Sequence, residues 1–187
     1  MDRTEFDRFA DEYQKLHSAN IKVSGEGPEF FAEYKVRDTA KLLRKTGMTG
    51  KVRILDFGSG VGNSIPHFRQ HIPGCDLTCL DVSQKSLSVA EERFKNKAKF
   101  VSFNGAQIPF SEEDFDVIYS ACVFHHIPHR EHADLLHEMH RVLRPGGLVI
   151  IFEHNPLNPL TVRVVNTCPF DENAVLIPAR QLVKKMA

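Results

Sequence analysis

The residues with the clearest potential for chemistry directly follow short apolar segments. A glycine-rich loop, residues 58–62, comes after the segment 52–57, and Asp81 comes after the segment 76–80. Glycines allow positive φ and let a backbone approach a ligand closely, while the start of a following helix offers free N–H groups to an anion. A carboxylate at the end of the second segment can accept hydrogen bonds from both hydroxyls of a ribose. The pattern therefore predicts a site for a ribose-bearing ligand.

A second group of polar residues follows two later apolar segments. His125 and His126 come after the fourth apolar segment of the chain, and Glu153 and His154 come after the fifth. Imidazole and carboxylate groups can orient an acceptor or take its proton as a general base. They can equally satisfy nearby backbone groups, and the sequence leaves the catalytic and the structural interpretation open.

Six of the ten histidines fall between His125 and His140, which raises the question of a zinc or nickel site. His129, His132 and His140 project from a similar side of a predicted helix. Eleven residues of helix span about 16 Å, however, which is too far for ligands of one ion. We therefore interpret His137 and His140 as the solvated flank of the helix, and we expect no metal site in the protein.

The elements that must position these groups alternate along the chain. Apolar segments rich in Val, Ile and Leu are separated by segments whose apolar residues recur at helical spacing. This alternation indicates parallel βαβ units with right-handed crossovers, and thus a doubly wound α/β fold that binds ligands beyond the carboxyl ends of its strands. Ser83 is expected to cap the helix that follows it. The predicted strands are 52–57, 76–80, 99–103, 115–123 and 148–152, and the predicted helices are about 4–17, 29–45, 61–72, 83–96 and 130–143.

Several motifs occur together and in order, beginning with ILDFGSGVG at 54–62. In this the chain resembles the class I S-adenosylmethionine-dependent methyltransferases, and closely the small-molecule branch that acts in ubiquinone and menaquinone biosynthesis. The resemblance implies a Rossmann-like sheet, S-adenosylmethionine as cofactor, and in-line transfer of its methyl group to a small-molecule acceptor. The other matching segments are 80–83, 104–110, 115–118, 125–126 and 141–147.

The resemblance also implies roles for individual residues. Asp56 would hold the amino group of the methionine part, the glycine loop would line the methionine part and the ribose, and Asp81 would hold the ribose. The family usually has Asp at the position of Asn104, where it accepts from the adenine amino group; the amide oxygen can still accept, so we expect weaker binding. The implied cofactor-binding residues are Asp56, Gly58, Ser59, Gly60, Gly62, Asp81, Val82, Asn104, Gly105, Ala106 and Ala121, and the candidate catalytic residues are His125, His126, Glu153 and His154.

Two other functions are compatible with such a fold. A nicotinamide-dependent oxidoreductase would carry glycines at relative positions one, three and six of the loop. Here they fall at one, three and five, and Asn63 occupies the sixth, so dinucleotide binding is disfavoured. A non-catalytic module that only binds S-adenosylmethionine stays open, because a fold does not fix a function.

The composition is that of an ordinary globular domain. The chain has 24 basic and 24 acidic side chains, so it lacks the overall basic field with which proteins hold nucleic acid. No apolar run reaches the roughly 20 residues needed to span a bilayer, and the first residues lack the apolar core of a signal peptide. The four cysteines show no metal-binding spacing. We therefore expect a cytoplasmic protein without a nucleic-acid partner.

The sequence also suggests how the chain is organised. We expect residues 1–48 to form a helical lid rich in aromatic residues and residues 49–187 to form the cofactor-binding domain. The enzymes that it resembles finish the sheet with two further strands after a helix, and here that helix begins at about 178. We therefore expect a shortened chain that lacks the last two strands. Either residues 161–167 or 174–177 cover the edge of the fifth strand, or this edge pairs with a second copy of the chain.

Overall fold

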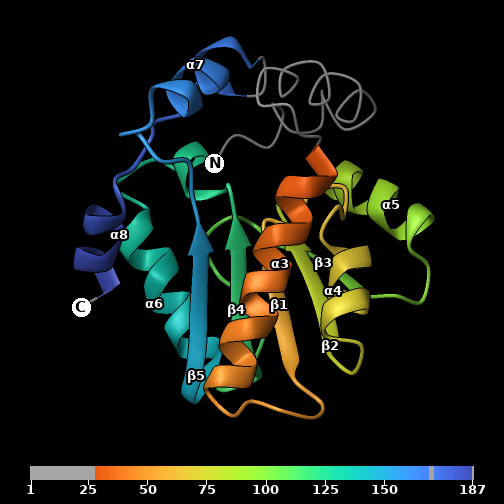
Figure 1. Cartoon of the computed structure of the whole chain (residues 1–187). Helices are drawn as coiled ribbons and strands as arrows, with labels where there is room; N and C mark the ends of the chain where they lie inside the picture. The colour runs from red at the N-terminus through yellow and green to blue at the C-terminus, as the bar shows by residue number, and fades with distance from the viewer. Residues whose placement is uncertain (1–27, 169–170, 187) are drawn as a thin grey trace.

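The computed structural model describes residues 28–168 and 171–186 (Figure 1). The predicted first helix over residues 4–17, with its part of the expected lid, lies outside the described residues. Within them, no helix is both long enough and apolar enough to cross a membrane.

A single parallel sheet organises the fold. Its strands are β1 (Arg53–Phe57), β2 (Asp76–Asp81), β3 (Lys99–Ser102), β4 (Phe115–Ala121) and β5 (Leu143–Phe152), and their spatial order is β3-β2-β1-β4-β5. All four strand pairings are parallel. The chain runs outward to β3, then crosses back to place β4 on the other side of β1. The order therefore reverses between β1 and β4, where doubly wound folds bind their ligands. The predicted fold class is confirmed.

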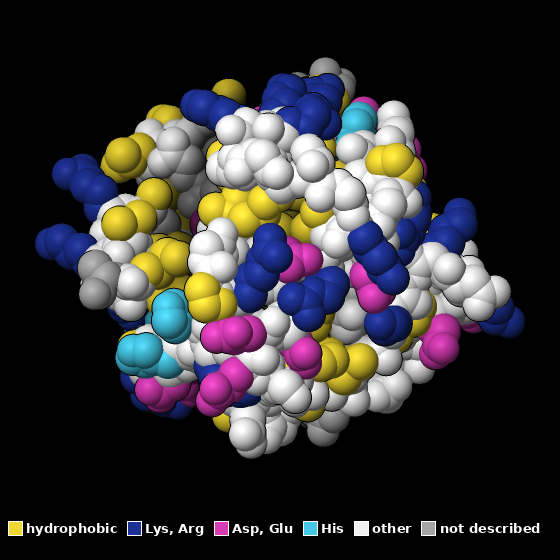
Figure 2. All heavy atoms as spheres, turned by 90° about the horizontal axis from the view of Figure 1, so that it is seen from below, with side chains coloured by type: hydrophobic (Ala, Val, Ile, Leu, Met, Phe, Trp, Pro, Cys, Tyr) yellow, Lys and Arg dark blue, Asp and Glu magenta, His cyan; other side chains and the backbone are white. Residues whose placement is uncertain are grey.

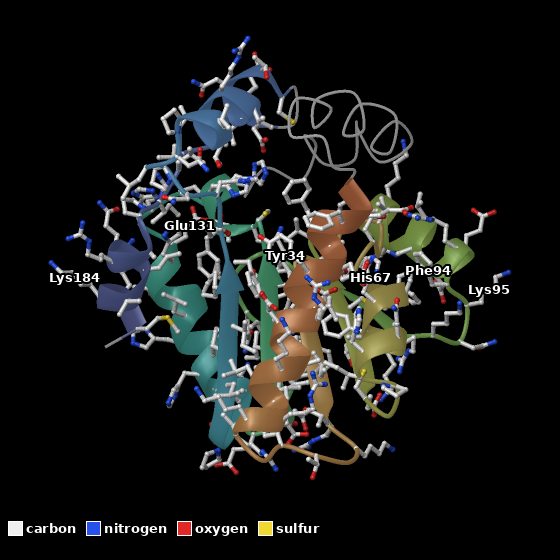
Figure 3. The ribbon with its side chains drawn as sticks, viewed as in Figure 1. Tyr34, His67, Phe94, Lys95, Glu131 and Lys184 are labelled. Carbon is white, nitrogen blue, oxygen red and sulfur yellow. The ribbon has the colours of Figure 1, made fainter. Side chains whose placement is uncertain are left out.

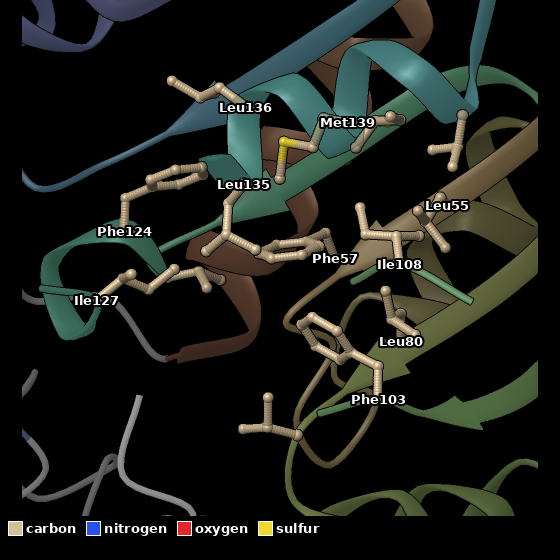
Figure 4. Close-up of a cluster of buried hydrophobic side chains, with 14 of the residues drawn as sticks. Leu55, Phe57, Leu80, Phe103, Ile108, Phe124, Ile127, Leu135, Leu136 and Met139 are labelled. Atoms are coloured by element: carbon tan, nitrogen blue, oxygen red, sulfur yellow. The ribbon is translucent and has the colours of Figure 1, made fainter. Parts of the chain in front are cut away.

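Helices cover both faces of this sheet, as the buried residues show. One apolar cluster joins the sheet to α3 (Pro28–Lys45), α4 (Ile65–His71) and α5 (Gln84–Arg93). The opposite cluster joins it to α6 (His132–Val142) and α8 (Ala179–Met186), and Figure 4 shows its core. Neighbouring side chains of β1 point to opposite clusters, with Ile54 in the first and Leu55 in the second. This two-sided burial explains the continuous apolar character of the strands.

Local signals in the sequence account for several helix boundaries. The hydroxyl of Ser83 accepts a hydrogen bond from the Ser86 N–H over 3.0 Å, so Ser83 caps α5 as predicted. The predicted inward-facing residues of α6, Leu135, Leu136, Met139 and Val142, are all buried. α8 begins within one residue of the predicted position 178.

The start of β5 differs from the prediction. Residues 145–147 were expected to form a turn ahead of the strand, whereas β5 already begins at Leu143. Leu143 pairs with Phe115 and Leu148 pairs with Val117, so the extra residues of β5 form a bulge between these two pairs. Gly146 accommodates the bulge with φ of +76°. The glycines thus bend the strand instead of preceding it.

The expectation that residues 161–167 or 174–177 add a strand beside β5 is wrong. Residues 161–167 lie in helix α7 (Pro159–Thr167), because Asn158 caps its start by accepting from Leu160 N at 3.0 Å and Pro159 fits its first turn. Residues 174–177 form no strand. Among the described residues, β5 is therefore an edge strand. α7 lies beyond the carboxyl ends of the strands (Figure 1).

The opposite end of the sheet is held by charged groups. Asp116 is buried at the start of β4, accepts from Arg53 N at 2.6 Å and pairs with Arg144 Nε at 2.9 Å. It therefore links the amino-terminal parts of β1, β4 and β5. Seen from this end, side chains of both charge signs are interspersed (Figure 2). This arrangement suits a stabilising role rather than an electrostatic binding surface.

Candidate functional site

The glycine loop connects the end of β1 to α4 in a backbone shape that requires its glycines. Gly58 has φ of +75°, and its N–H donates to Leu80 O over 2.8 Å. A side chain at Gly58 would overlap Val123. Gly60 also has positive φ, but apart from its two neighbours in the chain no described residue lies within 4 Å of the place that its Cβ would occupy. Gly60 is therefore the residue at which the loop leaves room for a ligand.

Gly62, which the sequence also assigned to cofactor binding, has a different environment. A Cβ at this position would come within 2.8 Å of Ile65 and 3.1 Å of Ala90 and Phe94. Its small size lets the loop pack against α5. A direct ligand contact of Gly62 stays a prediction.

Asp81 is held rigidly at the tip of β2. Its Oδ2 accepts from Gly60 N and its Oδ1 accepts from Ser83 N, both over 2.8 Å. The residue is only 8% exposed. Each carboxylate oxygen can accept more than one hydrogen bond, so Asp81 can fix the loop and still accept from a ligand hydroxyl. The adjacent Val82 is buried and would lie 3.5 Å from a Cβ at Gly105.

Asp56 is a buried acid without a full set of partners. It is 2% exposed, and its Oδ2 has no hydrogen-bond partner among the described residues. Burial, together with the negative charge of Asp81, raises the pKa of Asp56 to about 8. Burying a carboxyl group in this way costs stability, and a cation would relieve that cost. The observation fits a ligand with a positively charged amino group beside β1.

The segment after β3 is shaped by Asn104. Its Oδ1 accepts from the backbone N–H groups of Ala106 and Gln107, each over 2.9 Å. The amide oxygen therefore stabilises its own turn, which Gly105 closes with φ of +85°. Recognition of adenine by Asn104 and Ala106 stays a prediction. Ala121, the last residue of β4, is half-buried, and Cys122 after it adopts φ of +60°, which is rare for a side-chain-bearing residue.

The candidate catalytic residues do meet at the carboxyl ends of β4 and β5. Glu153, after β5, accepts from Val123 N at 2.8 Å and from Phe124 N at 2.7 Å through Oε1. Its Oε2 lies 2.6 Å from Nδ1 of His125 in η2 (Phe124–His126). Both carboxylate oxygens are thus hydrogen-bonded, and Glu153 holds the ring of His125 in place. A contact of Glu153 with an acceptor stays a prediction.

A fifth residue, Asp171, joins them. Its Oδ1 lies 3.4 Å from His125 Nε2 and 3.5 Å from His126 Nε2. The ring of His154 lies 4.9 Å from the ring of His125, centroid to centroid. We call these residues, namely His125, His126, Glu153, His154 and Asp171, the histidine cluster.

The three histidines of the cluster differ in pKa. Burial lowers the pKa of His125, but hydrogen bonds with Asp171 and Glu153 outweigh burial and raise this pKa to about 9. Burial and the neighbouring charge of His125 lower the pKa of both His126 and His154 to about 4. Near neutral pH, two neutral imidazoles therefore lie beside one that carries the positive charge.

Sequence reasoning missed Asp171 and Lys35. Asp171 comes after α7 in a segment without periodicity, and it reaches the cluster because Val175 N donates to His125 O over 2.8 Å. Lys35 of α3 donates to Cys122 Sγ over 3.0 Å at the tip of β4. In the sequence, Lys35 is one of several charged residues in a predicted helix, and only the aromatic residues of that helix, such as Tyr34, indicated a place near the site.

The two ends of α3, which was expected to belong to the lid, have different surroundings. The aromatic rings of Phe30, Phe31 and Tyr34 contact one another near its start. The ring of Tyr34 lies 6.4 Å from that of Phe152 at the end of β5. Figure 3 labels Tyr34 beside α3. Further along α3, Val36 and Leu43 are buried in the sheet-covering cluster. The start of α3 therefore adjoins the site, while the rest covers the sheet. The domain boundary at residue 48 stays a prediction.

The three histidines of α6 lie outside the cluster. His137 and His140 are exposed on α6, as interpreted from the sequence. His132 is buried, and its Nε2 lies 2.8 Å from Ile127 O, which ties α6 to the segment after η2.

Comparison with known proteins gives a consistent result. A family model described as a methyltransferase domain matches residues 55–151. A ubiquinone/menaquinone biosynthesis C-methyltransferase of Ectopseudomonas mendocina is 31% identical over 135 residues, which are 68% of this chain and 52% of that protein. A human thiol S-methyltransferase is 32% identical over 142 residues, which are 73% of this chain and 53% of that protein. The chain thus spans about half the length of these relatives.

The fold has counterparts among solved structures. The crystal structure of an S-adenosylmethionine-dependent methyltransferase from Thermotoga maritima superposes with a TM-score of 0.71 at 19% identity. The match covers 98% of this chain and 78% of that one. At this identity the likeness concerns the fold.

Proposed function

The chain belongs to the family of class I S-adenosylmethionine-dependent methyltransferases, and from this premise we propose that it transfers the methyl group of that cofactor to a small-molecule acceptor. The observation that carries the proposal is the arrangement of Asp56, Gly60 and Asp81 at the point where the strand order reverses. When bound, the cofactor supplies a methyl group on a positively charged sulfur. The protein's own residues must bind it, orient the acceptor and keep water away.

The residues at the strand tips suit the separate parts of the cofactor. Asp56 offers a buried carboxylate to the amino group, and its missing partner is the observation that supports this assignment. Gly60 leaves space above the loop, and Asp81 faces the same loop through its hydrogen bond to Gly60 N. We assign Asp81 to the ribose hydroxyls, and residues 104–106 to the adenine.

For the acceptor we propose the side of the site formed by the histidine cluster. His126 and His154 lie beside the tips of β4 and β5 and are partly exposed, whereas His125 is buried. Either imidazole can orient an acceptor through a hydrogen bond. Glu153 acts through His125, which it holds in one orientation. The names of the relatives, a quinone-pathway C-methyltransferase and a thiol S-methyltransferase, support acceptors that are small molecules.

Two measurements test the proposal. Isothermal titration calorimetry with S-adenosylhomocysteine and with NAD should show binding of the former alone. Asp81→Asn should weaken this binding, while Glu112→Gln, an exposed acidic residue outside the site, should leave it unchanged. Turnover with a panel of thiols, quinols and amines then separates an enzyme from a non-catalytic binding module. Binding without turnover of any acceptor would favour the module.

Pairing of the β5 edge with a second copy of the chain is a separate proposal. It is supported by the outer position of β5 in the sheet, since an edge strand presents unpaired N–H and C=O groups. Sedimentation velocity over a range of concentrations should reveal a dimer. A monomer at all concentrations would contradict it.

A further inference from the structure

We propose that His125, His154 and Asp171 form a binding site for a divalent transition-metal ion of the zinc class. The three residues come from separate parts of the chain: η2, the residues after β5 and the residues after α7. One potential ligand atom from each lies within 4.8 Å of those of the other two. None of these residues is exposed, so the grouping is not a chance meeting of surface side chains.

The distances resemble those of a metal site before its ligands close around an ion. Zinc bonds to histidine nitrogen and carboxylate oxygen of about 2.0–2.1 Å place tetrahedral ligand atoms about 3.3 Å apart. His125 Nε2 and Asp171 Oδ1 are 3.4 Å apart, which matches this spacing. The widest separation within the group, up to 4.8 Å, must shorten. His154 follows the end of β5 instead of lying within it, so a small turn of its ring can achieve this.

The hydrogen bond between His125 and Glu153 supplies the outer support that metal sites require. A histidine ligand ordinarily donates its second ring N–H to a carboxylate, which fixes the ring and its tautomer. Here Nδ1 of His125 lies 2.6 Å from Oε2 of Glu153. The other oxygen of Glu153 is anchored by Val123 N and Phe124 N. The arrangement directs Nε2 of His125 toward Asp171, where an ion would bind.

The carboxylates of the cluster also favour a cation. Two of them, with side chains only 8% and 12% exposed, flank the imidazole of His125. A divalent ion bound between Asp171 and the imidazoles of His125 and His154 would place positive charge beside these buried groups.

Three protein ligands leave at least one coordination position open, as in catalytic rather than structural zinc sites. If the proposed methyl transfer holds, this position lies on the acceptor side of the site. The sulfur of a thiol acceptor or the oxygen of a hydroxyl acceptor is a suitable fourth ligand. The inference departs from the expectation of a metal-free protein, which was drawn from the wide spacing of the histidines along the helix after residue 129; Asp171 and His154 lie outside that helix.

Metal binding can be measured without any assay of activity. The protein is prepared without a histidine tag, stripped with a chelator and titrated with zinc chloride by calorimetry. We expect one zinc ion per chain and an increase in melting temperature on its addition. Replacing zinc by cobalt(II) should give the visible absorption bands of a low-symmetry, tetrahedral-like site. Removing one ligand in Asp171→Asn or His154→Gln should abolish that signature, and Glu153→Gln should weaken binding by roughly 10- to 100-fold.

The matched control is His137→Gln with His140→Gln on α6, because both histidines are exposed and lie outside the cluster. This control should bind zinc as the wild-type protein does. Circular dichroism verifies that each variant is folded. A folded wild-type protein that takes up no zinc, or an Asp171→Asn variant that binds it unchanged, would overturn the proposal. S-Adenosylhomocysteine is titrated separately; its failure to bind would count against the proposed methyl transfer and not against the metal site.

Discussion

Nδ1 of His125 and Oε2 of Glu153 lie 2.6 Å apart, which joins the short helix after β4 to the residue after β5. Neighbouring parallel strands end side by side, so the two residues meet although 28 positions separate them in the chain. Because Glu153 also accepts from Val123 N and Phe124 N, it fixes both the backbone and the side chain of η2. The pair therefore holds together the proposed acceptor side of the site.

Glu153→Gln should destabilise the fold measurably. A glutamine can still accept from Val123 N and Phe124 N, but it loses the charge-assisted hydrogen bond to His125. Buried bonds of this kind contribute roughly 1.5–3 kcal/mol, so we expect a loss of unfolding free energy of that size. Urea denaturation followed by circular dichroism measures it. An unchanged midpoint would show that the pair contributes nothing to stability.

Asp81→Ala should weaken cofactor binding. The carboxylate is assigned to the ribose hydroxyls and also holds Gly60 N over 2.8 Å. Loss of these bonds should cost roughly 1.5–3 kcal/mol of binding free energy. Calorimetric titration with S-adenosylhomocysteine gives the value, with Glu112→Gln as control. Equal affinity in variant and wild type would refute the ribose assignment.

Asp56 should make cofactor binding depend on pH. Its pKa of about 8 in the free protein means that it is mainly protonated at pH 7. A bound ammonium group favours the ionised form of Asp56. Binding should therefore release about one proton per bound ligand near pH 6.5, and a smaller number per bound ligand at pH 8.5. Affinity should rise with pH up to about 8. Titrations in buffers of different ionisation enthalpy count the protons, and Asp56→Asn should abolish the release.

The same pKa predicts a trend in stability. A carboxyl group whose pKa is raised on folding favours the folded state only while it is protonated. The wild-type protein without cofactor should therefore lose stability as pH rises from 3.8, the usual value, to about 8. Asp56→Asn lacks this loss, so the stability of the variant relative to wild type should grow over that range. A constant difference would show that Asp56 titrates normally.

Two glycines of the loop should respond differently to alanine. Both Gly60 and Gly62 have positive φ, so each substitution costs roughly 1–2 kcal/mol of backbone strain. At Gly62 the new methyl group also meets Ile65, Ala90 and Phe94, which adds roughly 1–3 kcal/mol of overpacking. Gly60→Ala should thus retain more stability but lose cofactor affinity. Thermal unfolding and calorimetry on both variants measure the contrast, and equal loss of stability would contradict it.

Asn104→Asp should tighten cofactor binding. A carboxylate keeps an acceptor for the Ala106 and Gln107 N–H groups and adds a charged acceptor for the adenine amino group. Competition between S-adenosylhomocysteine and its inosine analogue, which lacks that amino group, isolates the effect. If the aspartate variant binds more weakly, adenine lies elsewhere.

Much of the fold and of the cofactor side could be predicted because their signals are local. Strands buried on both faces require continuous apolar segments, and the helices between them carry apolar residues at helical spacing. Parallel strands then bring their carboxyl ends to one edge of the sheet. The order of the chain was therefore enough to place Asp56, the glycine loop and Asp81 together, and to predict the cap at Ser83.

Other features could not be predicted from apolar periodicity. Residues 161–167 are β-branched enough for a strand, yet the cap at Asn158 and the proline after it favour a helix. Gly62 looked like a ligand-facing glycine, but packing against α5 determines its surroundings. Asp171 meets His125 only because the chain after α7 folds back onto η2 through Val175 N. The sequence by itself determined the sheet and the residues at its tips, since periodicity and turn chemistry act over a few residues. Only the tertiary structure decided the histidine cluster, because long-range packing brings its third segment into place.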